Sequence, residues 1–280
     1  MSSFTLRALF DSKIHLGHLS RFREPKMAPF IYGIKNGMSI INLEETQARL
    51  TAALQFISQL SERPGSKILF VGTKRAAQTI IKEQATRAMM PYVDRHWLGG
   101  MLTNYRTIRQ SVKRLKTLET MQQDSNFKGL TKKEGLTLQN KLSKLQQNVG
   151  GIKDMTGLPD ALFIIDIGHH HIAVSEAKKL RIPIIAVVDT NHSPEGIDYV
   201  IPGNDDAASA IQIYATLAAD AVIQGQSARQ VPEPVAAKPE PVIKTAKRAP
   251  IPIHYKKSVS DQLTSTSSTH STNQSNAQSS

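Results

Sequence analysis

The chain has 280 residues, of which 40% are hydrophobic and 5% aromatic, enough for one large domain or two modest ones. Its formal net charge of +12 and sequence pI near 9.8 are typical of proteins that meet a polyanion, either nucleic acid or an anionic membrane surface. Because the sequence has no apolar run near the roughly 20 residues of a membrane span, no evident secretory signal and no cysteine for disulfides or thiolate metal sites, we expect a cytoplasmic protein that does not enter a membrane.

The first 37 residues contain a short amphipathic segment and then a loop in which basic and aromatic residues alternate. Prolines and glycines in this stretch indicate an ordered loop rather than a helix. Basic groups pair with phosphates and aromatic faces stack on bases, so the mixture suits RNA, although Phe30 and Ile31 can equally anchor the loop on a core. The cations that we expect to contact RNA here are Arg21, Arg23, Lys26 and Lys35.

Strand and helix patterns alternate over the next sixty residues. Continuous or alternating apolar runs predict strands at 38–43, 67–72 and 91–94. Asn42 or its neighbour is placed to cap a helix after the first strand, and Thr73 to cap a helix that begins with Lys74 and Arg75. A helix N-terminus with these two cations can hold a phosphate, so both are candidate RNA ligands.

The stretch from Arg95 to Arg106 marks a junction between this pattern and a different one. It holds the only tryptophan, Trp97, beside an adjacent glycine pair that allows close backbone approach. Trp97 can stack on a base or plug the core beneath the following segment, and the two roles can coexist. We count Arg95, Trp97 and Arg106 as RNA-binding candidates.

Residues 103–153 have a helical period and almost no strand pattern. Two apolar stripes are separated by a break near residue 126, and Thr131 and Glu134 have the spacing of a capping box. We expect an inserted antiparallel helical hairpin, a coiled coil that projects from the core, with a plain pair of helices packed on the sheet as the alternative. Arg109, Lys113 and Arg114 lie in a run without acidic residues and complete the RNA-binding candidates.

Strands resume after the insertion. Apolar runs predict strands at 160–166, 182–189 and 198–202, with helices at 173–180 and about 207–224. Alternating strands and helices predict an α/β fold with a parallel, doubly wound sheet of the flavodoxin or Rossmann kind. We therefore expect a discontinuous globular domain at 1–102 and 154–225, the hairpin at 103–153, and a disordered tail at 226–280, which is rich in Pro, Ser, Thr and Gln.

This fold class raises an enzymatic alternative, a nucleotide-dependent enzyme. The strand-to-helix turn Val71-Gly72-Thr73-Lys74-Arg75-Ala76-Ala77 has neither a GxGxxG nor a P-loop spacing, and no nucleophile elbow is present. We therefore expect no enzyme activity and no cofactor.

Several histidines and acids fall at predicted strand ends, which meet at one edge of a parallel sheet. His18, Asp189, His192, Asp205 and Asp206 have side chains that can bind zinc. The simpler interpretation is surface histidine with Asp205 and Asp206 capping a helix, and we favour it over a metal site.

Several motifs together are similar to those of a known family, that of ribosomal protein two of the bacterial small (30S) subunit. The motifs span residues 4–225 and leave the tail without a counterpart; only the run His169-His170-His171 is denser in histidine than expected. The matching stretches are His15-Leu16-Gly17-His18, Pro25-Lys26-Met27, Pro29-Phe30-Ile31, Ile40-Ile41-Asn42-Leu43, Leu69 to Ala77, Arg95 to Asn104, Gly150 to Met155, Leu158-Pro159-Asp160, Val188-Asp189-Thr190-Asn191 and Ile201 to Asp206.

The resemblance implies an α/β domain with an inserted helical hairpin. It further implies a non-enzymatic, structural role in the small ribosomal subunit, in contact with its rRNA and with neighbouring proteins. The family is expected to dock late between the head and body of the subunit, to help the subunit's largest protein bind, and so to help recruit messenger RNA for translation.

Overall fold

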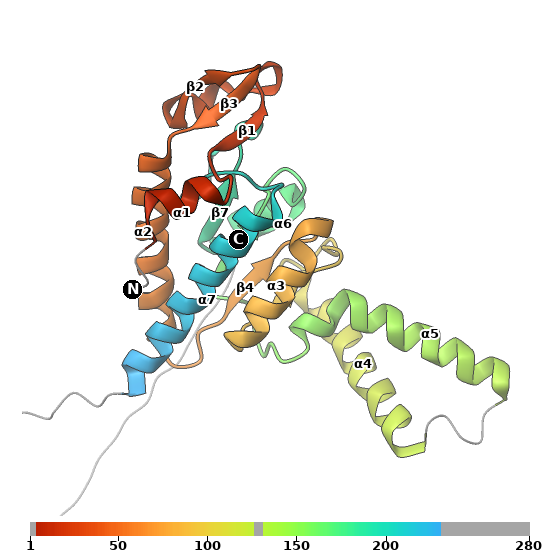
Figure 1. Cartoon of the computed structure of the whole chain (residues 1–280). Coiled ribbons are helices and arrows are strands. Elements are labelled where there is room, and N and C mark those ends of the chain that lie inside the picture. Colours follow the sequence, from red (N-terminus) through yellow and green to blue (C-terminus); the bar gives the residue numbers. More distant parts are fainter. Residues whose placement is uncertain (1–3, 126–130, 231–280) are drawn as a thin grey trace, which may run out of the picture. The chain divides into compact units, whose positions relative to one another are not determined.

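A computed structural model describes residues 4–125 and 131–230 of the chain (Figure 1). Its centre is a five-stranded parallel sheet with the strand order β5-β4-β6-β7-β8. The chain leaves β4 for one edge and then returns to its other side, so the topological switch point lies between the carboxyl ends of β4 and β6. The strands are β4 (Ile68–Val71), β5 (Tyr92–Val93), β6 (Ala161–Ile165), β7 (Ile184–Val188) and β8 (Tyr199–Pro202).

Helices cover both faces of this sheet, which confirms the predicted doubly wound α/β class. On one face, Phe70 and Phe163 join a core with α2 (Leu43–Ser61), α3 (Arg75–Arg87) and α7 (Ala208–Gln230). On the other face, alternate strand residues pack with α6 (His171–Leu180). Every residue of β6 and β7 is buried, as continuous apolar runs in a two-sided sheet require.

A second, three-stranded antiparallel sheet lies at the N-terminal end of the chain, with the order β1-β3-β2. The prediction of a loop across this stretch was partly wrong, because it contains 3₁₀ helices and a strand. Asn36 and Gly37 have φ angles of 51° and 75° and join β2 to β3 as a two-residue hairpin turn. The elements are α1 (Leu6–Asp11), β1 (Leu16–Leu19), η1 (Ser20–Phe22), η2 (Pro25–Phe30), β2 (Ile31–Lys35) and β3 (Met38–Ile41).

Of the caps predicted for α2, α3 and α5, those of α2 and α5 are confirmed and that of α3 is wrong. The Asn42 side chain accepts a hydrogen bond from the Glu44 backbone N–H at 3.0 Å. Thr131 and Glu134 form the reciprocal capping box at the start of α5. At α3 the cap position is Lys74, with no side-chain cap, because Thr73 pairs with a distant histidine instead.

Two helices fill the sequence interval between β5 and β6, as predicted for the insertion. They are α4 (Tyr105–Ser125) and α5 (Lys132–Val149), and the short η3 (Gly150–Ile152) follows them. Leu115 of α4 and Leu142 of α5 are buried in one cluster. Coiled-coil geometry and the domain boundaries stay predictions, and the break at residues 126–130 lies outside the described residues.

The last described helix, α7, ends at Gln230 rather than near residue 224. The helix continues through Gly225. A side chain at this position would collide with the Ser58 carbonyl oxygen, so the glycine allows α7 to pack closely on α2. The predicted tail lies outside the described residues from 231 onward. Within the described part, no helix is long and apolar enough to cross a membrane.

The junction before α4 is organised by one buried carboxylate, that of Glu176 on α6, which is 5% exposed. Its Oε1 accepts hydrogen bonds from the Trp97 indole N–H (3.2 Å) and the Gly100 backbone N–H (2.8 Å). Its Oε2 accepts from the Leu102 backbone N–H and from the Thr103 backbone and hydroxyl at 2.9–3.0 Å. Burial alone would raise the pKa of Glu176, but these donors stabilise the carboxylate and the net shift is downward.

We expect Glu176→Gln to lower the free energy of unfolding by about 3 kcal/mol. A glutamine amide keeps one acceptor oxygen and directs its NH₂ group at donors that can no longer be satisfied. Urea unfolding at pH 7 measures the change, with the exposed Glu83 of α3 replaced by Gln as the control. An unchanged urea midpoint for the Glu176 variant would contradict the role assigned to this carboxylate.

Candidate functional site

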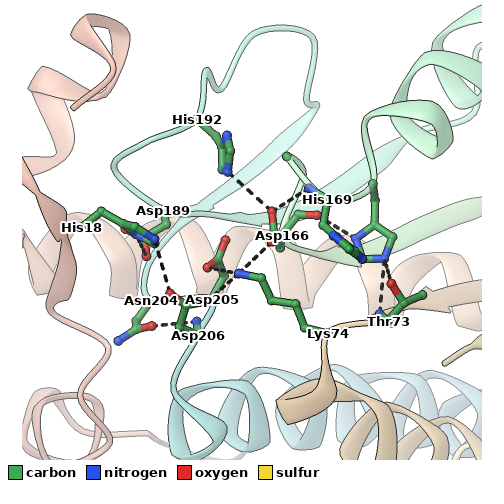
Figure 2. Close-up of polar contacts among 12 residues, drawn as sticks. His18, Thr73, Lys74, Asp166, His169, Asp189, His192, Asn204, Asp205 and Asp206 are labelled. Atoms are coloured by element: carbon green, nitrogen blue, oxygen red, sulfur yellow. Dashed lines mark hydrogen bonds and ion pairs between the residues drawn. The ribbon is translucent and has the colours of Figure 1, made fainter. Parts of the chain in front are cut away.

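A lysine lies at the switch point of the sheet, surrounded by carboxylates (Figure 2). The Lys74 Nζ is 2.7 Å from Asp166 Oδ2, 2.9 Å from Asp205 Oδ1 and 2.6 Å from Asp206 Oδ1. Asp166 follows β6, and the other two acids follow β8, so three strand ends converge here. Burial lowers the pKa of Lys74, but the hydrogen bonds that it donates to Asp166, Asp205 and Asp206 and the charge of Asp205 outweigh burial and raise the pKa overall.

The carboxylates of this cluster differ in their ionisation. Burial raises the pKa of Asp166, yet its hydrogen bonds with Lys74 and the His169 backbone N–H make the net shift downward. Burial and the charges of Asp166 and Asp189 raise the pKa of Asp205 to about 7, against the effect of Lys74. Asp205 Oδ2 is buried without a hydrogen-bond partner among the described residues, as suits a carboxyl group that is partly protonated near neutral pH.

His18 of β1 extends the cluster (Figure 2). Its Nδ1 lies 3.0 Å from Asp189 Oδ2 and its Nε2 lies 3.3 Å from Asp206 Oδ2. The hydrogen bond to Asp189 raises the pKa of His18, with a smaller opposing effect of burial. Among the described residues, no three His, Cys, Asp or Glu side chains are arranged to hold a metal ion.

The capping role predicted for Asp205 and Asp206 was wrong. Ala207 is at the N-terminal cap position of α7, because its carbonyl accepts the hydrogen bonds from the Ala210 and Ile211 backbone N–H groups. In the turn before the helix, Asn204 Oδ1 accepts hydrogen bonds from the backbone N–H groups of Asp206 (2.8 Å) and Ala207 (3.1 Å). The two aspartates accept hydrogen bonds from Lys74 instead.

The histidine run after β6 contributes one buried ring, that of His170. Its Nδ1 lies 2.7 Å from the Asp166 carbonyl oxygen, so Nδ1 carries the proton and donates. Its Nε2 then accepts from the Thr73 backbone N–H at 3.3 Å, which fixes the turn between β4 and α3. Burial is the main cause that lowers the pKa of His170 to about 4, so the ring is neutral. Nearby, His192 Nε2 lies 3.7 Å from Asp166 Oδ1.

We call the carboxyl edge of the sheet around Lys74, Asp166, Asp205 and Asp206 the switch-point crevice, and this place is unsuited to phosphate. The carboxylates around Lys74 outnumber it and repel an anion, although α3 begins beside it. Lys74 is engaged in ion pairs inside the protein, and these favour a structural role for it over the RNA contact, which stays a prediction. Its neighbour Arg75 is exposed and keeps its candidacy.

Trp97 is 6% exposed and lies in the core cluster shared by α4, α5 and the sheet. Its indole N–H is taken by Glu176. A ring buried this deeply has no free face for a base, so the structure supports the packing role of the two predicted for Trp97.

The remaining RNA-binding candidates are exposed, but they are not all together. Lys26 Nζ forms an ion pair with Glu195 Oε1 at 2.6 Å, and Arg95 Nε lies 3.8 Å from Asp94 Oδ2. The Arg21 guanidinium stacks on Phe22, 4.7 Å from the ring centroid. The exposed candidates are Arg21, Arg23, Lys26, Lys35, Arg75, Arg95, Arg106, Arg109, Lys113 and Arg114.

Three candidates meet in one place, an open groove along α4 that we call the cationic groove. Arg106, Arg109 and Lys113 lie at steps of three and four residues, so they share a helix face. Lys116 of α4 and Lys153 after η3 add two more cations to the lining. The groove also contains Asp154, whose carboxylate lies 3.7 Å from Lys116 Nζ. Arg114 is exposed on α4 but does not line the groove. Lys116 belongs to the same basic run without acidic residues but was not among the candidates, and Lys153 gave no signal in the sequence because only the fold brings it back beside α4.

Comparisons with known proteins agree with the motifs. The sequence model of the family described as "Ribosomal protein S2" matches residues 9–225. A protein of Hahella chejuensis (strain KCTC 2396), described as "Small ribosomal subunit protein uS2", is 58% identical over 227 residues. That alignment covers 81% of this chain and 89% of the relative. The region matched by the family model contains both sheets and the cationic groove.

We expect Lys74→Met to destabilise the free protein by about 3 kcal/mol at pH 8, because it leaves buried carboxylates without their cation. The loss should be smaller at pH 5.5. Asp205 has a folded-state pKa of about 7, above its unfolded value of about 3.9. Its protonation therefore stabilises the fold at low pH, and that contribution is lost as pH rises through about 7.

Urea unfolding at the two pH values measures this difference. The exposed Lys82 of α3, replaced by Met, is the matched control and should change little at either pH. A Lys74 variant as stable as the control at pH 8, or one with no pH dependence, would contradict the assignment.

Proposed function

Since the chain belongs to the ribosomal protein S2 family and is thus a structural protein of the small ribosomal subunit, we propose that it binds the rRNA of that subunit through the cationic groove. The family recognised from the sequence motifs is confirmed. The binding surface, the partners and the cytoplasmic ribosome as its location are our proposals.

The observation that carries the proposal is the charge in the groove. Five cations line it against a single acid, Asp154. A regular spacing of cations along one helix face suits a row of phosphates, because Lys and Arg side chains neutralise the backbone charge and release counterions. Such contacts fix position and orientation on the RNA rather than read its sequence.

The enzymatic alternative is disfavoured by the switch-point crevice. In sheets of this kind a nucleotide binds where the strand order reverses, with its phosphates at a helix N-terminus. Here that position holds Lys74 and its carboxylates, and the glycine-rich spacing is absent. Calorimetry with dinucleotides and nucleoside triphosphates should detect no binding, and saturable binding at the crevice would revive the alternative.

We also propose that the chain supports docking of the largest small-subunit protein. An apolar surface on the N-terminal sheet fits a protein neighbour better than a phosphate. Tyr32 and Ile34 of β2 are 82% and 57% exposed, and Phe22 nearby in sequence is 55% exposed. Exposed apolar side chains gathered in one short segment are typical of a protein contact.

To test the rRNA contact, we expect the triple variant Arg106→Ala, Arg109→Ala, Lys113→Ala to rebind small subunits depleted of this chain at least about tenfold more weakly at 200 mM salt. The plot of log K against log salt should become shallower by roughly 2–3, since about one unit of slope is lost for each phosphate contact. Occupancy on sucrose gradients over a salt series gives both values.

The matched control removes the same charge from exposed positions outside the groove that are not RNA-binding candidates, with Lys133, Lys141 and Lys144 of α5 changed to Ala. It should rebind much like the unchanged protein. Equal losses in the two variants would show a general charge effect, and no loss in the groove variant would refute the contact.

To test the protein contact, we expect Tyr32→Ser with Ile34→Ser to lower the amount of the largest small-subunit protein on purified subunits severalfold, while the occupancy of this chain is unchanged. The control replaces two exposed leucines elsewhere, Leu136 and Leu158, with Ser. Quantitative mass spectrometry of the subunits reads both proteins. A full complement of the largest protein on the Tyr32 and Ile34 variant would place its docking surface elsewhere.

A further inference from the structure

A pocket adjoins the cationic groove at the amino edge of the sheet. It has a volume of about 440 Å³, and its lining includes Lys67, Met89, Pro91, Tyr92, Gly150 and Gly151. Lys153, Asp154 and Met155 line both the pocket and the groove, so the two hollows share one wall. The pocket lies at the edge opposite the switch-point crevice, because Lys67 and Pro91 precede β4 and β5.

We propose that this pocket receives an unpaired base of the RNA whose phosphates occupy the groove. The proposal rests on the proposed function and names the part of the RNA that the site would select, a looped-out nucleotide within or beside a strand. A duplex would meet the groove with its phosphates only. A looped-out nucleotide adds a flat, largely apolar ring with polar edges, which is the kind of group that proteins extract from RNA.

The lining has the chemistry of a base pocket. Met89, Pro91 and Tyr92 form apolar walls, and Met89 is 73% exposed. A thioether side chain is flexible and polarisable, so Met89 can close over an aromatic ring. Polar groups stand among these walls, with Lys67 and Lys153 as donors and the carboxylate of Asp154 as acceptor.

Two adjacent glycines of η3, Gly150 and Gly151, line the pocket and differ in the space around them. A side chain at Gly151 would collide with the Tyr92 carbonyl and ring, so glycine lets η3 pack directly on β5. Gly150 differs, because its φ and ψ of −60° and −40° suit any residue. Among the described residues, apart from its chain neighbours and the backbone of its own helix, a Cβ at Gly150 would have one atom within 4 Å, Gln146 Cγ at an ordinary contact distance of 3.7 Å. A side chain at this position can therefore fill space in the pocket without straining the fold.

We therefore choose Gly150→Leu to fill the pocket and call it the plug variant. The matched control is Gly157→Leu. Gly157 is exposed, a Cβ there meets nothing within 4 Å, and it lines neither hollow. Urea unfolding first checks that both variants keep their stability. Met89→Glu, which puts a negative charge at the pocket instead of bulk, serves as a second variant if the plug fails to fold.

The experiment measures rebinding to small subunits depleted of this chain, over a salt series, together with base-specific chemical probing of the rRNA. We expect Gly150→Leu to weaken binding between about 5-fold and 150-fold, the range that stacking of one base contributes. The salt slope should not change, because the phosphate contacts remain. One or a few unpaired nucleotides that the unchanged protein protects should become reactive.

Two results would overturn the proposal. In the first, the plug and Met89 variants bind like Gly157→Leu and protect the same nucleotides, so no base enters the pocket. In the second, binding weakens with no change in base reactivity while a crosslink to a neighbouring protein is lost, so a protein side chain occupies it. Either result leaves the groove proposal standing, whereas an unchanged salt slope in the groove triple variant refutes the groove contact itself.

Discussion

The arrangement of the α4 region depends on the carboxylate of Glu176, which is buried on α6 and accepts five hydrogen bonds from residues 97–103. Backbone N–H groups in an irregular buried turn need hydrogen-bond acceptors. Here the two oxygens of one ionised carboxylate accept from the backbone N–H groups of Gly100, Leu102 and Thr103. The same contact holds Trp97 in the core, within the irregular segment that leads into α4. The direction of α4, and with it the position of the cationic groove, therefore follows from an electrostatic interaction inside the α/β core.

A second internal interaction explains why a fold that often binds nucleotides does not present their site here. Lys74 stands where phosphates would lie, and its charge is neutralised by acids that follow β6 and β8. The two edges of the sheet thus differ in the sign of the charge that predominates there. The carboxyl edge holds an acid-rich ion-pair cluster, while the hollows at the other edge and along α4 have more cations than acids in their lining. This separation fits a protein that holds a polyanion in place rather than transforms a small molecule.

Local patterns predicted the local features well. The buried strands follow from continuous apolar runs, and the caps at Asn42 and Thr131 follow from interactions within three residues. The Asn36-Gly37 turn was also readable, because this pair is a strong hairpin signal, but the prolines around it favoured a loop. The errors are at residues whose partners lie far away in sequence. Thr73 bonds to His170 rather than to its own helix, and Lys74 meets acids that only the assembled sheet brings to it. The sequence made both Lys74, at a helix N-terminus, and Lys113, in a run without acidic residues, candidate RNA ligands, and only burial and ion pairing separate them.

The central claim is that the cations of α4 face rRNA inside the small subunit. The most direct test of this claim places a photocrosslinking amino acid at Gln110, a groove-lining position of α4. Its crosslinks in intact subunits are then mapped to residue and nucleotide. The same probe at the exposed Gln139 of α5, which does not line the groove, is the reference position. The account predicts that Gln110 crosslinks to a defined stretch of rRNA much more strongly than Gln139. Crosslinks from Gln110 only to neighbouring proteins, or none at all in fully occupied subunits, would contradict it.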